Sequence, residues 1–199
     1  LVRDINSAAV ACARTACDEF MERDPRRPRF IAGSIGPTTK QTAISTKVED
    51  ASYRGVTFDQ MVKSYYVQVA ALVEAGVDIL LPETVIDTLN LKACLFAISK
   101  YFEDHGVRVP VMISATFDKG GATFVSGQEV EAFWNAISHF PMLSVGMNCA
   151  LGPELMRPHL ETLQSVSSRW ISCHPNAGLP NEMGQYDLGP AAMAQLLRE

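Results

Sequence analysis

Three side chains suited to binding a substrate or a metal directly follow apolar segments of the sequence. Glu83 comes after the run I-L-L-P, and Asn148 and Cys149 come after S-V-G-M. In proteins that alternate parallel strands with helices, ligands bind where the strands end. A carboxylate in such a place needs a partner, and the amine of a substrate is a natural one. The sequence therefore places its candidate chemistry at two strand ends.

Cys149 has two interpretations when it is considered alone. A cysteine at a strand end more often packs in the core than does chemistry, and a catalytic zinc usually needs three protein ligands. Cys173 and His174 are the nearest helpers by spacing, but neighbours along a strand point to opposite faces, so at most one of them can face Cys149. The other cysteines lie on apolar faces of predicted helices and are expected in the core: Cys12, Cys17 and Cys94.

Glu83 also has a structural alternative, since it could form an ion pair or cap the next helix. Asp87 is the better candidate for that cap, so we favour ligand binding for Glu83. Gly146 and Gly152 are expected to let the chain bend tightly around Cys149. The H-P-N-A-G segment at residues 174–178 reads as a tight turn, which fits ordinary loop chemistry as well as a binding role.

Five apolar segments rich in β-branched residues have the features of strands, and helical periodicity follows each of them. This alternation predicts an α/β fold with a parallel sheet. The strand that would precede the first helix is absent from this order. The predicted strands are residues 30–35, 78–81, 110–115, 143–147 and 170–173.

Six stretches have helical periodicity, the first at residues 5–20 and the last at residues 191–197. Thr57 with Gln60 forms a capping box ahead of one helix, and Ser126 with Glu129 repeats the pattern ahead of another. Residues 89–102 carry apolar side chains on one helical stripe. Residues 38–56 are too long for an idle connection, so they are a candidate functional loop.

The composition argues against several classes of function. The formal net charge is -5, and the one basic cluster lies in a proline-containing loop, so no nucleic acid is expected as a partner. No apolar stretch approaches the roughly 18 residues that span a bilayer, and the first residues lack a signal-peptide layout. We therefore expect no membrane partner and a cytoplasmic location. Five cysteines without framework spacing argue against disulfides.

The motifs at the strand ends together resemble those of the homocysteine S-methyltransferase family. The matching segments are G-S-I-G-P-T, E-T-V-I-D-T-L-N-L-K-A, G-M-N-C-A-L-G-P and H-P-N-A-G-L-P-N-E-M-G-Q-Y-D, in the order expected for the family. The last segment resembles the cobalamin-dependent methionine synthases more than the betaine-dependent or S-adenosylmethionine-dependent relatives. The resemblance runs along essentially the whole chain.

This resemblance implies a (β/α)8 TIM barrel, of which residues 1–199 are one domain truncated at both ends, with about five strands and their helices. It also implies that zinc, held by three cysteine thiolates, activates homocysteine. Cys149 matches the first of these ligands, and two further cysteines are expected outside this chain. Glu83 matches the glutamate that engages the homocysteine amine, and Asn148 lies beside the metal ligand, in the substrate-binding region.

The same resemblance implies the methyl donor and the partners. Methylcobalamin, bound on another domain of the parent protein, would give its methyl group to homocysteine to form methionine. Cobalamin-binding and folate-binding domains of the same parent chain are the expected partners.

Two other functions stay open on the sequence. One is a different β/α-barrel enzyme, such as a lyase or an aldolase, in which Glu83 works with a lysine. No lysine lies at the end of a predicted strand, since Lys92 and Lys100 are on a predicted helix and Lys119 is in a loop, which weakens this alternative. The other is a non-catalytic domain that binds a small molecule or packs against other domains. An opened barrel would also leave two strand edges unpaired, so self-association is expected.

Overall fold

The computed structural model describes residues 1–178 and 180–199, and along them helices alternate with short strands. The elements are α1 (Val2–Arg23), β1 (Ala32–Ile35), α2 (Phe58–Glu74), β2 (Ile79–Pro82), α3 (Thr88–His105), β3 (Met112–Ala115), α4 (Val130–Ile137), β4 (Ser144–Asn148), α5 (Pro153–Val166), β5 (Trp170–His174) and α6 (Pro190–Leu196).

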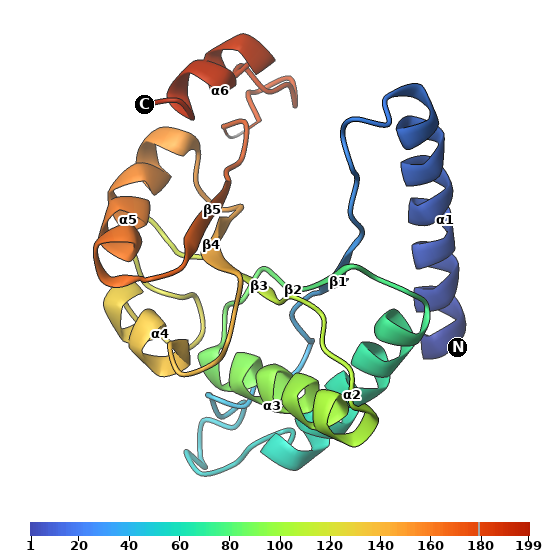
Figure 1. Cartoon of the computed structure of the whole chain (residues 1–199). Coiled ribbons are helices and arrows are strands. Elements are labelled where there is room, and N and C mark those ends of the chain that lie inside the picture. The colour runs from blue at the N-terminus through green and yellow to red at the C-terminus, as the bar shows by residue number, and fades with distance from the viewer. Residues whose placement is uncertain (179) are drawn as a thin grey trace.

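The five strands run parallel and lie side by side in chain order. β1 pairs with β2, and β3 pairs with β4, which pairs with β5. Two single bridges, Leu80 with Val111 and Val85 with Ala115, join β2 to β3. The strands therefore form one curved row, with the helices around its outside and with α1 and α6 at opposite ends of the arc (Figure 1). The result is an α/β fold whose strands make an open arc.

The two faces of the row differ because side chains alternate along a strand. On β1, Gly33 and Ile35 are buried, whereas Ala32 and Ser34 are exposed. The buried face packs on the helices and builds the hydrophobic core, with Leu80 at 0% exposure on β2. The other face looks into the concave side of the arc, where the polar residues discussed below lie.

Most predicted elements are present with shifted ends. All five predicted strands and all six predicted helices are found. The Thr57 hydroxyl and the Gln60 side chain form the predicted capping box of α2. Asp87 caps α3, as its position predicted, because its carboxylate accepts from the backbone N–H groups of Leu89 and Asn90.

Two helix predictions were wrong. Ser126 and Glu129 do not form a capping box: α4 begins after Glu129 without a side-chain cap, and the Ser126 hydroxyl instead bonds the Thr123 hydroxyl at 2.7 Å. Cys12 is exposed rather than in the core, because α1 buries only Val10. Cys94 is buried as predicted, and burial raises the pKa of its thiol.

Gly146 serves a purpose other than the predicted bend. It lies within β4, opposite Ser172 of β5, and a Cβ placed on it would stand 2.0 Å from the Ser172 carbonyl oxygen. Two strands can approach this closely only where one of them has no side chain. Gly146 is therefore required for the pairing of β4 with β5. This pairing places the end of β5 beside the turn that follows β4.

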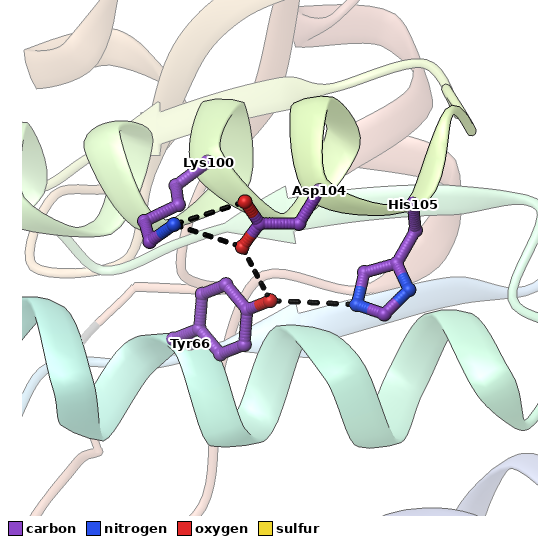
Figure 2. A network of polar contacts seen from close by, with 4 residues as sticks. All are labelled: Tyr66, Lys100, Asp104 and His105. Atoms are coloured by element: carbon purple, nitrogen blue, oxygen red, sulfur yellow. Dashed lines mark hydrogen bonds and ion pairs between the residues drawn. The ribbon is translucent and has the colours of Figure 1, made fainter.

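A polar network on the surface ties α2 to α3 (Figure 2). The Tyr66 hydroxyl donates to Asp104 at 2.8 Å, and Lys100 donates to both Asp104 oxygens at 2.9 Å. The Lys100 and Tyr66 hydrogen bonds lower the pKa of Asp104, and the same carboxylate raises the pKa of Tyr66. Lys100 and Asp104 are exposed to water and Tyr66 is only partly buried, so the network orients the helix pair and adds little stability.

The ends of the row are exposed. Within the described residues, β5 pairs only with β4, and Trp170 on β5 is 76% exposed. Phe30, just before β1, is 65% exposed. Among the described helices, none is both long enough and apolar enough to cross a membrane.

We predict that Gly146→Ala destabilises the fold strongly. The new methyl group would overlap a backbone oxygen, which cannot rotate away, so the loss should reach the upper end of overpacking costs, about 3 kcal/mol or more. Urea unfolding followed by circular dichroism measures it. Gly55→Ala is the matched control, because a Cβ at Gly55 meets nothing within 4 Å; equal stability of the two variants would contradict the close approach of β4 and β5.

Candidate active site

Asn148, the last residue of β4, connects three neighbouring strand ends. Its Oδ1 accepts from the Ser114 hydroxyl of β3 at 2.7 Å and from the Thr84 backbone N–H at 3.1 Å. Its Nδ2 donates to the Thr84 hydroxyl at 2.8 Å. The side chain is 8% exposed, so these bonds form largely out of water, where an unpaired amide would be costly. Asn148 thus fixes the position of the chain that leaves β2 relative to β3 and β4.

The turn after β4 has an unusual backbone. Cys149 and Ala150 both have positive φ angles, 49° and 58°, a conformation that costs an L-residue roughly 1–2 kcal/mol. Two hydrogen bonds hold the turn against the end of β5 and the chain after it, and a third closes within the turn itself. The Cys149 N–H donates to the His174 carbonyl at 3.0 Å, the Leu151 N–H to the Cys149 carbonyl at 2.6 Å, and the Asn176 N–H to the Leu151 carbonyl at 2.9 Å.

Thr116 supports the Cys149 side chain from the end of β3. Its hydroxyl donates to the Asn148 carbonyl at 3.1 Å and lies 3.3 Å from Cys149 Sγ. The thiol is half-buried, so it is neither sealed in the core nor freely mobile. Because the Thr116 hydroxyl has one proton and gives it to the Asn148 carbonyl, the thiol is the donor in its contact with Thr116.

Cys173 and His174 diverge, as strand alternation requires. The Cys173 thiol donates to the Met156 sulfur of α5 at 3.7 Å, on the helix-covered face, and burial raises the pKa of this thiol. The His174 side chain is exposed on the opposite face. Cys173 is therefore a packing residue, and the contact of His174 with Cys149 is through the backbone.

Glu83 lies on the concave face at the end of β2. The Ser34 hydroxyl of β1 donates to its carboxylate, and its own N–H donates to the Ile35 carbonyl at 3.1 Å. In the described part of the chain, no Lys, Arg or His lies within ion-pair distance of Glu83. The helix cap is made by Asp87 instead. Neither of the structural alternatives for Glu83 is realised, and its charge faces the concavity.

The long connection at residues 38–56 is pinned beside this region. Asp87 Oδ2 accepts from the N–H groups of Thr42 and Ala43 at 3.1 and 3.0 Å, while its Oδ1 caps α3. Asn90 Oδ1 accepts from the Thr42 hydroxyl at 2.6 Å. One carboxylate thus fixes both the start of a helix and the loop that passes over it. Gly36 and Gln41 line a small hollow next to Glu83.

A larger hollow opens beside the Cys149 turn. Its volume is about 490 Å³, and Ala150, Lys119 and Gly178 are among its lining residues. In the segment at residues 174–181, Leu179 lies outside the described residues, and Asn181 binds backbone groups of its own turn. Its Oδ1 accepts from the N–H groups of Met183 and Gln185, which assigns it to the turn. The Asn176 backbone is bound to the Cys149 turn, as described above.

The metal-binding capacity of the described residues is limited to part of a site. Within residues 1–178 and 180–199, no three His, Cys, Asp or Glu side chains are grouped closely enough to hold a metal. Cys149 is compatible with one corner of a thiolate site, since the residue is only partly buried and a hydroxyl lies next to its sulfur. Further sulfur ligands would have to come from outside the described residues.

Three supporting residues escaped the sequence analysis: Ser34, Thr84 and Thr116. Each lies at or next to a strand end, where polar residues could have drawn attention. Serine and threonine are also ordinary turn residues, so this signal alone does not separate them from others. Their importance depends on partners that are 32–64 positions distant in sequence.

Comparison with known proteins gives a consistent result. A family model described as homocysteine S-methyltransferase matches residues 1–199. Crystal structures of the homocysteine methyltransferase MmuM from Escherichia coli share the fold at 20% identity. The apo form has a TM-score of 0.73 over 98% of this chain and 72% of that one. The metallated form has a TM-score of 0.67 over 99% and 71%.

The structural likeness, at this level of identity, speaks for the fold, whereas the family model covers every position of the chain, the strand ends around Glu83 and Cys149 included. The chain belongs to the homocysteine S-methyltransferase family.

Proposed function

We propose that this chain forms the homocysteine-binding part of a zinc-dependent methyltransferase that makes methionine. The observation that carries the proposal is the pair of strand ends that Asn148 joins: a half-buried thiol, Cys149, on one side and a carboxylate without a cationic partner, Glu83, on the other. Homocysteine has a thiol at one end and an ammonium group at the other. With zinc held at Cys149, the site would offer a metal to the thiol end of this substrate and a carboxylate to its ammonium end.

In this proposal Cys149 is one of three thiolate ligands of zinc, and the other two come from outside the described residues. Zinc supplies the deprotonation of the homocysteine thiol at neutral pH, since a thiol that coordinates a metal loses its proton. The Thr116 hydroxyl lies 3.3 Å from Cys149 Sγ. Once that sulfur is a thiolate, the hydroxyl can turn its one proton from the Asn148 carbonyl to the sulfur and would then stabilise the charged ligand. The hydrogen bonds of the turn keep the sulfur facing the concavity.

Glu83 binds the homocysteine ammonium group. A carboxylate at a partly enclosed strand end gains a charge-assisted hydrogen bond from such a ligand. Ser34 restricts the carboxylate from the β1 side and leaves its second oxygen available. Asn148 acts on the substrate chiefly through Thr84; its Nδ2 has one further hydrogen that a bound substrate could accept.

The methyl donor follows from the segment H-P-N-A-G-L-P, which resembles the cobalamin-dependent methionine synthases. We infer that methylcobalamin, carried on another domain of the parent protein, supplies the methyl group, and that folate-binding and cobalamin-binding domains are the partners of this one. We also infer that in the parent protein the arc is completed to a (β/α)8 barrel. The sharing of the fold with MmuM supports this architecture.

The rival functions have less support. A lyase or aldolase that forms a Schiff base needs a lysine in a desolvated place near the carboxylate, whereas Lys92, Lys100 and Lys119 are all exposed. A purely binding function would not require an accessible thiol on a backbone turn held in a costly conformation. Zinc content and turnover of the whole protein separate these functions.

We expect Cys149→Ser in the complete protein to abolish stoichiometric zinc and turnover. Loss of one of three thiolates removes a large share of the binding free energy of the metal. Zinc is measured by atomic emission on protein purified without added metal. Cys173→Ser is the matched control, because Cys173 packs against α5, and it should keep its zinc. Full zinc and activity in the Cys149 variant would refute the assignment.

We expect Glu83→Gln to weaken homocysteine binding and to leave zinc in place. A charge-assisted hydrogen bond is worth about 1.5–3 kcal/mol, which corresponds to a roughly ten- to hundred-fold change in affinity. Calorimetric titration with homocysteine measures it in the complete protein. An affinity equal to that of the unmodified protein would mean that Glu83 has only structural partners.

We expect residues 1–199, when produced alone, to self-associate in a concentration-dependent way. β5 exposes an unpaired edge with Trp170 on it, and such edges pair with other chains. Sedimentation velocity over a range of concentrations measures the effect. Trp170→Lys should weaken the association, since a charged side chain blunts an edge. A single monomeric species at all concentrations would contradict this expectation.

A further inference from the structure

The pairing of β2 with β3 contains one extra residue on the β2 side. Leu80 pairs with Val111 and Val85 pairs with Ala115. Five positions separate the two residues on the first chain, whereas four separate those on the second. Such a mismatch is a β-bulge, which redirects the side chains that follow it. The extra residue falls at Thr84, where φ is 55°.

The bulge decides which way Glu83 and Val85 face. Without it, the two residues would share a face, because they are two positions apart. With it, Glu83 faces the concave side, while Val85 is 7% exposed and packs in the core with Ala115. The Val85 N–H donates to the Ser114 carbonyl at 3.2 Å, and its carbonyl accepts from the Thr116 N–H at 3.0 Å.

Thr84 is an unfavourable residue for this conformation. A β-branched side chain at positive φ is a real outlier, and left-handed backbone costs an L-residue the equivalent of a roughly five- to thirty-fold shift in population. Asn148 offsets this conformational cost by binding both the backbone and the side chain of Thr84. It accepts from the Thr84 N–H at 3.1 Å and donates to the Thr84 hydroxyl at 2.8 Å. No other side chain in the described residues bonds the Thr84 N–H.

We propose that Thr84 is a positioning residue: Asn148 holds it in the left-handed conformation, and Thr84 in turn fixes the direction of the Glu83 side chain. Because Cys149 directly follows Asn148 in the chain, the same contact also fixes the position of Glu83 relative to Cys149. This inference rests on the proposed function, in which Glu83 binds the substrate ammonium group. Asn148, which directly precedes the proposed metal ligand, holds Thr84. Thr84 in turn directly follows Glu83, the proposed amine-binding carboxylate. The two ends of the substrate are therefore placed at a fixed spacing by one side chain.

Removal of the Asn148 amide should let residue 84 relax toward negative φ, so that Glu83 is correctly aimed in only a fraction of molecules. The apparent affinity for a ligand falls by the same fraction. Asn148→Ala should thus raise the homocysteine KM by roughly five- to thirty-fold, the population shift set by the backbone cost. The kcat per bound zinc should change much less.

Glycine at position 84 provides a specific rescue. Glycine adopts positive φ without a steric cost, so Asn148→Ala combined with Thr84→Gly should recover most of the lost affinity. Asn148→Ala combined with Thr84→Ala is the matched control, because alanine removes the same hydroxyl but keeps the cost of positive φ. A hydrogen bond that served only general stability would give no difference between the two double variants.

The experiment measures homocysteine KM, kcat and zinc content, together with calorimetric homocysteine binding, for these variants in the complete protein. We expect better binding with glycine than with alanine at position 84, at equal zinc content. If Asn148→Ala does not fold, the single Thr84→Ala and Thr84→Gly variants carry the same comparison. Equal affinity of the glycine and alanine variants, or an unchanged KM in Asn148→Ala, would overturn the inference.

Glu83→Gln separates this failure from a failure of the proposed function. If Glu83→Gln weakens homocysteine binding but glycine gives no rescue, only the positioning role of Thr84 is wrong. If Glu83→Gln has no effect on homocysteine binding, the proposed role of Glu83 is wrong, and the positioning role falls with it.

Discussion

The bonds of the Asn148 amide are the constraint on which the rest of the site depends. Parallel strands all end at the same edge of the sheet, where each chain turns toward a helix. The backbone N–H and C=O groups of these turns need hydrogen-bond partners wherever they are buried. Asn148 satisfies a backbone N–H and two hydroxyls from two neighbouring strand ends at once. Because the amide is nearly buried, loss of any partner leaves a polar group unpaired. The relative position of the strand ends is therefore fixed to within the tolerance of a hydrogen bond.

Costly backbone conformations are concentrated around this amide. Thr84, Cys149 and Ala150 are the non-glycine residues with positive φ among those described. Thr84 lies just after β2, and Cys149 and Ala150 lie just after β4, whose last residue is Asn148. Local strain of this kind persists only where the surroundings over-determine it. Here Asn148 holds Thr84, and hydrogen bonds to the end of β5 and to the chain after it hold the turn that contains Cys149 and Ala150. Strain and support are thus parts of one arrangement that sets the direction of the Glu83 and Cys149 side chains.

The division of the sheet into two unlike faces explains why the fold tolerates such a site. The helix-covered face supplies the hydrophobic core, with Leu80, Ile113 and Val145 fully buried, so the concave face does not need apolar side chains. The concave face can then carry Ser34, Glu83 and other polar groups, as parallel α/β folds do at the carboxyl ends of their strands. Gly146 serves both the sheet and the site, because it lets β5 pair closely with β4 and so brings the end of β5 close enough to support the Cys149 turn.

Sequence alone determined the order of the elements, the capping of two helices and the position of Glu83 and Cys149 at strand ends. These features depend on periodicity and on neighbours a few positions apart, which a sequence displays directly. It mistook Ser126 for a cap, because serine bonds equally well to a nearby hydroxyl, and it mistook Gly146 for a bend. Only the tertiary structure decided that Asn148 holds Thr84, 64 positions away, and that one extra residue turns Glu83 inward. Both depend on strand register, which long-range packing sets.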